Sequence, residues 1–315
     1  MSDEENDNND IFADDWGADH RSGVVAVVGR PNVGKSSLIN AILGQKIAIA
    51  TPKPQTTRRQ QLGILTLPEA QVLFVDTPGI HKPHNKLGEY MLSSAEGALR
   101  DADVVLWILD ASEKPQSGDQ YIAEKMQTVK RATVILVLNK TDLLKGVVDF
   151  TEHLALAPEA RDIRLSAKTG KNVDTLTKDL IGLLPLGPRY YPVDQMSDVN
   201  MRFIAAEIIR EKIINNTSKE IPHSVAVEID GFIEEEDRSV ISAIIYVEKD
   251  SQKGILIGKG GEMIKRIGTQ ARHEIVGQLG TAVHLDLRVK VLSNWRDDED
   301  LMRRMGYRLN KEDED

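Results

Sequence analysis

Eight residues near the start of the chain combine two glycines, a lysine and a serine at a spacing that can hold phosphate. They follow the apolar run Val24–Val28 and read GRPNVGKS. The order Gly-x-x-x-x-Gly-Lys-Ser is the phosphate-binding loop pattern, in which backbone N–H groups turn inward around phosphate oxygens. The lysine would reach the β- and γ-phosphates, and the serine hydroxyl would ligate Mg²⁺. The candidate nucleotide-binding residues here are Gly29, Arg30, Pro31, Asn32, Val33, Gly34, Lys35 and Ser36.

A second motif, DTPG, follows the apolar run VLFV. Its aspartate could hold Mg²⁺ through water, and its glycine N–H could sense a γ-phosphate. The next residue is an isoleucine, at the position where Ras-like GTPases have a glutamine that orients the attacking water. We therefore expect slow intrinsic hydrolysis. The candidate nucleotide-binding residues in this segment are Asp76, Thr77, Pro78, Gly79 and Ile80.

The NKTD and SAK segments favour guanine over adenine. The Asp142 carboxylate can accept hydrogen bonds from N1–H and the N2 amine of guanine; adenine offers neither donor and would leave a desolvated, unpaired carboxylate. The Lys140 stem could pack along the base, Asn139 could tie the pocket together, and the Ala167 N–H could face the base carbonyl O6. The candidate base-binding residues are Asn139, Lys140, Thr141, Asp142, Ser166, Ala167 and Lys168.

The polar loop ATPKPQTTRRQQ, between the phosphate loop and DTPG, indicates a switch. A threonine there could ligate Mg²⁺ only when the γ-phosphate is present, so GTP would order the loop and hydrolysis would release it. Thr57 is the first choice and Thr56 the second, because spacing does not separate them; an exposed basic loop is the alternative. The predicted metal ligands are Ser36, Thr57 and Asp76.

Four residues are expected to act in hydrolysis itself. Asn32, inside the phosphate loop, is a candidate for holding a monovalent cation, K⁺, against the phosphates through its amide oxygen. Lys35 would contribute positive charge, Thr57 the hydroxyl of the switch loop, and Gly79 its backbone N–H. The full catalytic set is Lys35, Thr57, Gly79 and Asn32.

A second glycine-rich turn, in LIGKGGEMI, has the G-x-x-G pattern of a KH domain, which clamps the backbone of about four single-stranded nucleotides. The segment from Lys253 to Arg272 carries five basic residues and one acidic residue, Glu262, on a chain of net charge −9. A local basic patch on an acidic chain favours nucleic acid at this place. The alternative is a helix-entry turn with a solvated charged face. The candidate RNA-binding residues are Gly258, Lys259, Gly260, Gly261, Lys265, Arg266 and Arg272.

Short apolar runs ending in polar turns alternate with helical stretches up to about Leu184, which predicts an α/β domain with a mostly parallel sheet and helices on both faces. The remainder has a helix, two alternating strands, the glycine turn with its helix, and a third strand, the type II KH order of a smaller α+β domain. The expected boundaries are an acidic tail over 1–20, a GTPase domain over 21–185, a linker over 186–197, a KH domain over 198–295, and a C-terminal helix with an acidic tail over 296–315.

Composition limits the alternatives. The 315 residues suffice for about two domains, and none is cysteine, so disulfides and thiolate metal sites are excluded. Residues 1–20 contain eight acidic residues and no Lys or Arg, which predicts a disordered solubilising tail, with a regulatory arm as the alternative. No apolar run approaches the length of a membrane span.

Together the segments GRPNVGKSSLIN, PQTTRR, DTPGIHKP, NKTD, LSAKTG, GPRYYPVDQ and GILIGKGGEMIKRIG resemble the bacterial Era GTPase family, from about Gly23 to Tyr307. The resemblance implies a GTPase domain plus a KH domain, GTP or GDP with Mg²⁺, slow hydrolysis and a role in maturing the small 30S ribosomal subunit. It also implies that the KH domain grips the 3′ end of 16S ribosomal RNA. A cytoplasmic location with peripheral inner-membrane association follows from it, and we expect a monomer.

Three other functions remain open. The chain could be an RNA-binding assembly factor whose nucleotide is only structural. It could be a P-loop kinase with a small-molecule acceptor, which NKTD and SAK argue against. It could be a membrane-signalling GTPase, although no lipidation signal or basic amphipathic helix supports that function.

Overall fold

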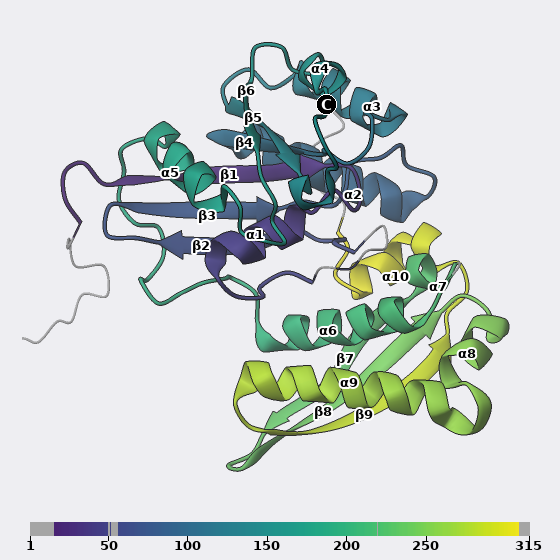
Figure 1. Ribbon diagram of the computed structural model, residues 1–315. Helices are drawn as coiled ribbons and strands as arrows, with labels where there is room; N and C mark the ends of the chain where they lie inside the picture. Colours follow the sequence, from purple (N-terminus) through teal and green to yellow (C-terminus); the bar gives the residue numbers. More distant parts are fainter. Residues whose placement is uncertain (1–15, 50, 52–55, 219, 309–315) are drawn as a thin grey trace, which may run out of the picture.

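The computed structural model describes residues 16–49, 51, 56–218 and 220–308. Six strands form the larger sheet in the spatial order β2–β3–β1–β4–β5–β6 (Figure 1). Neighbouring strands are parallel except for β2, which runs antiparallel to β3 at one edge. The mostly parallel sheet expected from the sequence is confirmed. Its strands are β1 (Arg21–Gly29), β2 (Gln61–Thr66), β3 (Ala70–Asp76), β4 (Val104–Asp110), β5 (Thr133–Asn139) and β6 (Arg161–Arg164).

Helices cover both faces of this sheet because successive strand residues point to opposite sides. In β4, Val104 and Leu106 pack under α1 and α5, whereas Val105 and Trp107 pack under α2, α3 and α4. The strands are buried on both faces and therefore read as continuous apolar runs. The helices of this domain are α1 (Lys35–Leu43), α2 (Lys86–Asp101), α3 (Ser117–Met126), α4 (Thr151–Leu154) and α5 (Val173–Leu183).

The parallel arrangement brings the polar motifs together. β1 ends at Gly29, β3 at Asp76 and β5 at Asn139, and the carboxyl ends of parallel strands lie at one edge of the sheet. The two edge strands were not among the expected strands. β6 is only four residues long with an arginine at each end, and β2 contains Gly63, so neither has a strong apolar run.

The second domain has a three-stranded sheet, β7–β8–β9, in which β7 and β8 are antiparallel and β8 and β9 parallel. Helices α6 and α9 cover one face of it, as the type II KH order predicts. An unexpected helix, α8, precedes the glycine turn, so this turn joins two helices. The elements are α6 (Met201–Asn216), α7 (Ile221–Ser224), β7 (Ala226–Glu234), β8 (Arg238–Val247), α8 (Asp250–Ile257), α9 (Glu262–Leu279), β9 (Ala282–Val291) and α10 (Glu299–Arg304).

The predicted linker contains no helix or strand, but it lies along the larger sheet. The Gln71 side chain accepts hydrogen bonds from the Tyr190 and Tyr191 N–H groups at 2.7 and 3.0 Å. Further along, the Ser197 hydroxyl donates to the Leu62 carbonyl at 2.7 Å. The linker is therefore held against β2 and β3 along its length.

The two predicted tails fall mostly outside the described residues, which include neither 1–15 nor 309–315. Within the predicted N-terminal tail, His20 is buried, and its Nδ1 lies 2.9 Å from the Gly187 carbonyl oxygen. The tail prediction is therefore wrong for this residue, which packs against the linker. Among the described helices, none combines the length and apolar character needed to cross a bilayer.

A cluster of buried side chains joins the two domains. Leu87 and Met91 of α2 pack with Tyr246 of β8 and with Trp295 and Tyr307 near the C-terminus. The indole of Trp295 stacks on Tyr307 with ring centroids 6.0 Å apart and donates to the Ser224 carbonyl at 2.8 Å. The described part of the C-terminal segment thus fixes the KH domain against the helix that follows the DTPG loop.

Candidate nucleotide-binding site and nucleic-acid interface

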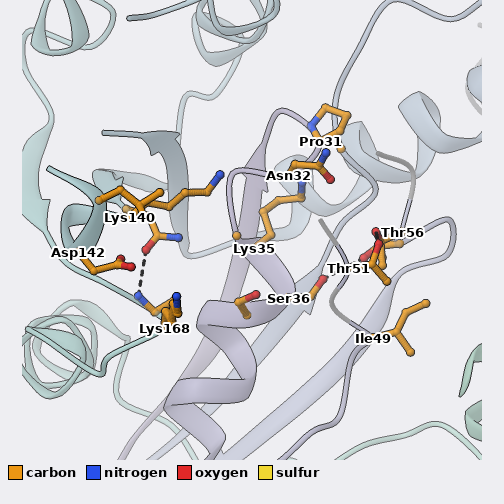
Figure 2. A pocket seen from close by; sticks show the side chains of 17 residues that line it. Pro31, Asn32, Lys35, Ser36, Ile49, Thr51, Thr56, Lys140, Asp142 and Lys168 are labelled. Carbon is orange, nitrogen blue, oxygen red and sulfur yellow. Dashed lines mark hydrogen bonds between the residues drawn. The ribbon is translucent and has the colours of Figure 1, made fainter. Parts of the chain in front are cut away.

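A cavity of about 670 Å³ lies at the carboxyl ends of β1, β3 and β5. Figure 2 shows Lys35 and Ser36 at its centre, with Lys140 and Asp142 on one side and Thr51 and Thr56 on the other. This volume is in the range of small-molecule sites. The cavity therefore has a phosphate-loop centre, a base-recognition end and a switch end.

The phosphate loop is shaped by close backbone approach. Gly34 has φ of 102°, and an added Cβ would lie 2.3 Å from the Asn139 side-chain nitrogen. No side chain fits there. Lys35 and Ser36 follow the loop in the first turn of α1, where helix N–H groups face the cavity.

The Lys35 ammonium is buried and donates to the Gly29 and Arg30 carbonyls at 3.1 and 3.0 Å. Burial lowers its pKa to about 8, because desolvation disfavours the charged form. A phosphate group next to this ammonium would restore the favourable environment that burial removes.

Three side-chain oxygens converge beside the lysine. The Ser36 hydroxyl donates to Asp76 Oδ2 at 2.6 Å, and the Thr57 hydroxyl lies 3.0 Å from both the Ser36 oxygen and Asp76 Oδ2. The second carboxylate oxygen, Oδ1, is buried with no partner, and burial raises the pKa of Asp76. Hard oxygen donors around an orphaned carboxylate oxygen fit Mg²⁺.

The two switch threonines face different ways. Thr57 is buried and points to this oxygen cluster. The Thr56 hydroxyl lies 2.9 Å from the Thr51 hydroxyl, on the cavity wall. The geometry therefore favours Thr57 over Thr56 for a metal. Within the predicted switch segment, residues 50 and 52–55 lie outside those described.

The base end is organised by Asn139. Its side chain donates to the Val33 carbonyl at 2.9 Å and accepts from the Ala167 N–H at 3.0 Å, so it joins the phosphate loop to the SAK loop. This tie was expected from the sequence. The Ala167 N–H was expected to face the base carbonyl, but it is already engaged by Asn139. A base carbonyl would have to share it.

The Asp142 carboxylate is also positioned. The Ser166 hydroxyl donates to its Oδ1 at 2.7 Å. Nearby, Lys140 makes a 2.5 Å ion pair with Asp110. Burial alone would raise the pKa of Asp110, but this ion pair and hydrogen bonds from Ser112 outweigh it, so the pKa lies below its usual value. The ion pair thus fixes the Lys140 side chain, which lines the base end of the cavity.

Several predicted nucleotide-binding residues do not line the cavity. Ile80 is fully buried in the core under α2, and only its backbone N–H reaches the site, donating to the Gly29 carbonyl at 3.1 Å. Arg30 turns away to Glu113 and Asp119 at 2.6 and 2.7 Å. The predicted residues outside the lining are Gly29, Arg30, Val33, Asp76, Thr77, Pro78, Ile80, Thr141 and Ser166.

Four lining residues were not predicted. Ser37 and Leu143 directly follow recognised motifs, so their place in the chain could have indicated them. Ile49 carries no local signal, whereas Thr51 lies inside the predicted switch loop but was not selected there; both line the cavity. The other predicted residues line the cavity: Pro31, Asn32, Gly34, Lys35, Ser36, Thr57, Gly79, Asn139, Lys140, Asp142, Ala167 and Lys168.

In the second domain, the G-x-x-G turn links α8 to α9. Gly258 has φ of 74°, and an added Cβ would lie 2.8 Å from Met263 Cβ, so only glycine fits. Lys259 and Gly260 are exposed at the tip. A shallow hollow of about 310 Å³ lies beside α9 and β9, lined by Lys265 and Arg272 over apolar side chains that include Leu285 and Leu287.

Not every predicted RNA-binding residue belongs to this hollow. The guanidinium of Arg266 contacts the Met263 sulfur at 3.1 Å and does not line it. Lys265 and Arg272 line the hollow, whereas the glycine turn 258–261 does not. We refer to this hollow as the KH groove; basic side chains over an apolar base suit a single-stranded backbone.

The switch segment and the KH domain are in direct contact. Arg58, the residue after Thr57, is buried and donates to the Val225, Pro222 and His223 carbonyls at 2.7, 3.0 and 3.0 Å. In return, buried Arg210 of α6 donates to the Thr56 carbonyl. These contacts were not predicted, because neither PQTTRR nor the sequence of α6 indicates which carbonyls the arginines contact.

A further ion-pair network lies at the same boundary. Lys46, in the loop after α1, contacts Glu211 and Glu274 at 2.5 and 2.6 Å. Burial would raise the pKa of Glu274, but Lys212 and Lys46 outweigh it, so this pKa is lowered. Helix α9 is therefore tied electrostatically to the nucleotide-binding domain.

The fold and the site define a P-loop GTP-binding domain joined to a KH domain. A family model described as a 50S ribosome-binding GTPase matches residues 24–140, and a KH domain model matches 220–296. A solved structure of Era with MgGDPNP and nucleotides 1506–1542 of 16S ribosomal RNA is 38% identical, with a TM-score of 0.88 over 92% of this chain and 100% of that one.

A structure of an Aquifex aeolicus Era variant bound to GDP·AlF4⁻ is 39% identical, with the same TM-score of 0.88 and the same coverage of 92% and 100%. The chain therefore belongs to the Era family of GTPases. The family and the two-domain fold expected from the sequence are confirmed.

Replacing the acceptor at the base end tests the guanine assignment. We expect Asp142→Asn to weaken GDP and GTP binding by roughly 10- to 100-fold, because an amide replaces one acceptor by a donor and a charge-assisted hydrogen bond contributes about 1.5–3 kcal/mol. Xanthosine diphosphate, which has a carbonyl in place of the amine, should bind the variant better than GDP. Calorimetric titration measures both affinities.

The matched control is Asp174→Asn, an exposed aspartate in the first turn of α5, which should leave binding unchanged. An Asp142→Asn protein that still prefers GDP over xanthosine diphosphate would remove Asp142 from base recognition.

Proposed function

We propose that this protein is a slowly hydrolysing GTP switch that binds 16S ribosomal RNA near its 3′ end and assists maturation of the 30S subunit. The observation that carries this proposal is the direct contact, through Thr57 and Arg58, between a guanine-nucleotide pocket and a KH domain. A 38% identical family member has been solved with MgGDPNP and a 16S ribosomal RNA segment. A purely structural nucleotide and a membrane-signalling role are not favoured.

In this proposal Asp142 and Lys140 hold the guanine, while Lys35 and the loop N–H groups hold the β- and γ-phosphates. Ser36, Thr57 and Asp76 would hold Mg²⁺, whose charge stabilises the phosphate oxygens during transfer. The Thr57 hydroxyl already lies within 3.0 Å of the other two side chains, which supports its selection as the switch ligand.

The residue after DTPG is an isoleucine, which has no polar group to orient the attacking water. Ile80 is fully buried, so its side chain cannot orient water. The described residues contribute positioning and charge: the Gly79 N–H at the γ-phosphate, the Lys35 ammonium, and the amide of Asn32 on the cavity wall. Water attack on the γ-phosphate is then slow, as expected from the sequence.

Asn32 provides a test of cation assistance. It has φ of 68°, so Asn32→Gly removes the amide without straining the left-handed backbone. We expect the native protein to hydrolyse GTP severalfold faster in K⁺ than in Na⁺ at equal ionic strength. The variant should lose that difference and keep its GDP affinity. Phosphate-release assays measure the rates, and equal rates in both salts for the native protein would contradict this role.

The link between nucleotide and RNA follows from two adjacent side chains. Arg58 lies in a cradle of three carbonyls at the end of α7. A Mg²⁺ ion bound with GTP would fix the neighbouring Thr57 and so would favour this position of Arg58. If hydrolysis releases Thr57, the Arg58 guanidinium would no longer be held in place and could leave the three carbonyls. Helix α2 provides a second connection, because it follows the DTPG loop and packs on Trp295.

We expect the protein to bind a 16S 3′-end oligonucleotide with different affinities in GDP and in a non-hydrolysable GTP analogue. The Lys259→Asp, Gly260→Asp variant should lose RNA binding in both states, because negative charge replaces the exposed tip of the loop. Gly260 has open space and a left-handed φ of 61° that aspartate tolerates, so the fold should survive. Fluorescence anisotropy measures the affinities.

Equal RNA affinity in both nucleotide states would leave two independent activities on one chain. RNA binding that survives in the loop variant would instead place RNA elsewhere on the protein.

A separate variant tests the link. Arg58→Ala should abolish the nucleotide dependence of RNA affinity while GDP affinity stays within about twofold, because Arg58 does not line the nucleotide cavity. The matched control is Arg161→Ala, an exposed arginine of β6 whose ion pair is with Asp179 of α5, within the nucleotide-binding domain. Circular dichroism verifies that both variants fold. An unchanged nucleotide dependence in Arg58→Ala would contradict the link.

Three further points belong to the proposal. The domain limits are a GTPase domain over 21–185, a linker over 186–197, a KH domain over 198–295 and a C-terminal segment over 296–315. The protein works as a monomer in the cytoplasm. Peripheral contact with the inner membrane is implied only by the family resemblance, and liposome sedimentation would test it.

A further inference from the structure

A second basic hollow lies on the nucleotide-binding domain, away from both sites described above. It has a volume of about 450 Å³ and is lined by residues at the end of α2, at the end of α3 and in the segment leading to β5. We refer to it as the α2–α3 hollow. The nucleotide cavity lies at the carboxyl ends of the strands, whereas this hollow lies beside the amino ends of β4 and β5, at the opposite edge of the sheet.

The charge of the hollow is strongly positive for its size. Arg100, Lys125, Lys130 and Arg131 line it together with one acidic residue, Glu96. Glu96 makes a 2.7 Å ion pair with Lys125. Lys130 and Arg131 add two further positive charges on a chain whose net charge is −9, and a local excess of positive charge attracts anions.

Helix dipoles explain only part of this cluster. Arg100 and Lys125 occupy the last turns of α2 and α3, where a basic residue stabilises the helix end. Lys130 and Arg131 lie beyond α3, in the connecting segment, and both are exposed. Among the described residues, no carboxylate lies within ion-pair distance of either.

The lining indicates the class of ligand. Its apolar residues, which include Leu99 and Val129, are aliphatic, and no aromatic side chain is present to stack a base. No large exposed hydrophobic side chain occurs along α2, α3 or the segment to β5, so a membrane-inserting surface is missing from this part of the described chain. Positive charge without base-reading groups suits phosphates of a nucleic-acid backbone.

We propose that the α2–α3 hollow binds phosphates of ribosomal RNA as a second, sequence-independent contact. This inference rests on the proposed RNA-binding function. Helix α2 connects the hollow to the KH side: Lys86 in its first turn pairs with Glu299 at 2.7 Å, and Arg100 lies in its last turn. Sixteen residues of helix span about 24 Å, so the hollow lies one helix length from the end of α2 that contacts the C-terminal segment. The short oligonucleotide of the test is limited to the roughly four nucleotides that a KH domain clamps.

The test compares two RNAs and two charge-matched variants. Lys130→Glu, Arg131→Glu reverses the two exposed charges of the hollow. Lys145→Glu, Lys178→Glu makes the same change in net charge at exposed lysines outside it. Each protein is titrated with intact 16S ribosomal RNA and with the short 3′-end oligonucleotide at several salt concentrations.

For the hollow variant we expect roughly tenfold weaker binding to 16S ribosomal RNA, and a salt dependence whose slope falls by about 1–2, because up to two phosphate contacts are lost. Binding to the short oligonucleotide, GTP hydrolysis and thermal stability should match the native protein. The control variant should retain both the affinity and the slope.

Three results would overturn the proposal. The hollow variant could bind 16S ribosomal RNA as the native protein does. Both variants could weaken it equally, which would indicate net charge alone. The hollow variant could lose binding to vesicles containing anionic lipid while its RNA affinity stays intact, which would indicate a membrane contact. Failure of the native protein to bind the short oligonucleotide would instead count against the proposed function itself.

Discussion

The buried guanidinium of Arg58 and the three carbonyl oxygens that receive its hydrogen bonds are the contact on which the arrangement of this protein depends. A buried arginine is costly unless its donors are satisfied. The KH domain satisfies the two terminal nitrogens with backbone carbonyls at the end of α7, whereas Nε is buried without a hydrogen-bond partner. The buried position of this charged side chain therefore depends on those carbonyls staying in place. Since Arg58 follows Thr57, this condition is coupled through one peptide bond to the oxygen cluster beside Lys35.

The other interdomain contacts support the same geometry by different physical means. The stacked Trp295 and Tyr307 and the apolar residues of α2 contribute non-directional burial. The ion pairs of Lys46 with Glu211 and Glu274 are partly exposed and so are weakened by salt. Hydrogen bonds to Arg58 define orientation, whereas the apolar cluster contributes burial that does not depend on direction. A change at the nucleotide can thus affect the directional contact without dissolving the whole boundary.

The nucleotide site is organised by its own polar network. Asn139 joins the phosphate loop to the SAK loop, and Ser166 orients the Asp142 carboxylate. Ser36, Thr57 and Asp76 hold one another through hydrogen bonds, leaving a buried carboxylate oxygen without a partner. A site whose side chains are already oriented loses less conformational entropy when a ligand binds.

The sequence by itself determined the chemistry of this protein. The spacing of Gly29, Gly34, Lys35 and Ser36, the NKTD segment and the G-x-x-G turn each depend on a few neighbouring residues, so a linear reading detects them. Apolar runs with polar ends likewise predicted the central strands, because burial on both faces leaves a local signature. The edge strands β2 and β6 were not predicted, because their short and weakly apolar sequences leave no such signature.

Tertiary structure decided what depends on distant segments. Only the folded chain separates Thr57 from Thr56, turns Arg30 and Ile80 away from the nucleotide cavity, and brings Ile49 and Thr51 into it. It also places Arg58 against carbonyls more than 160 positions away in sequence. Backbone carbonyls carry no residue identity, so no motif could have indicated that contact.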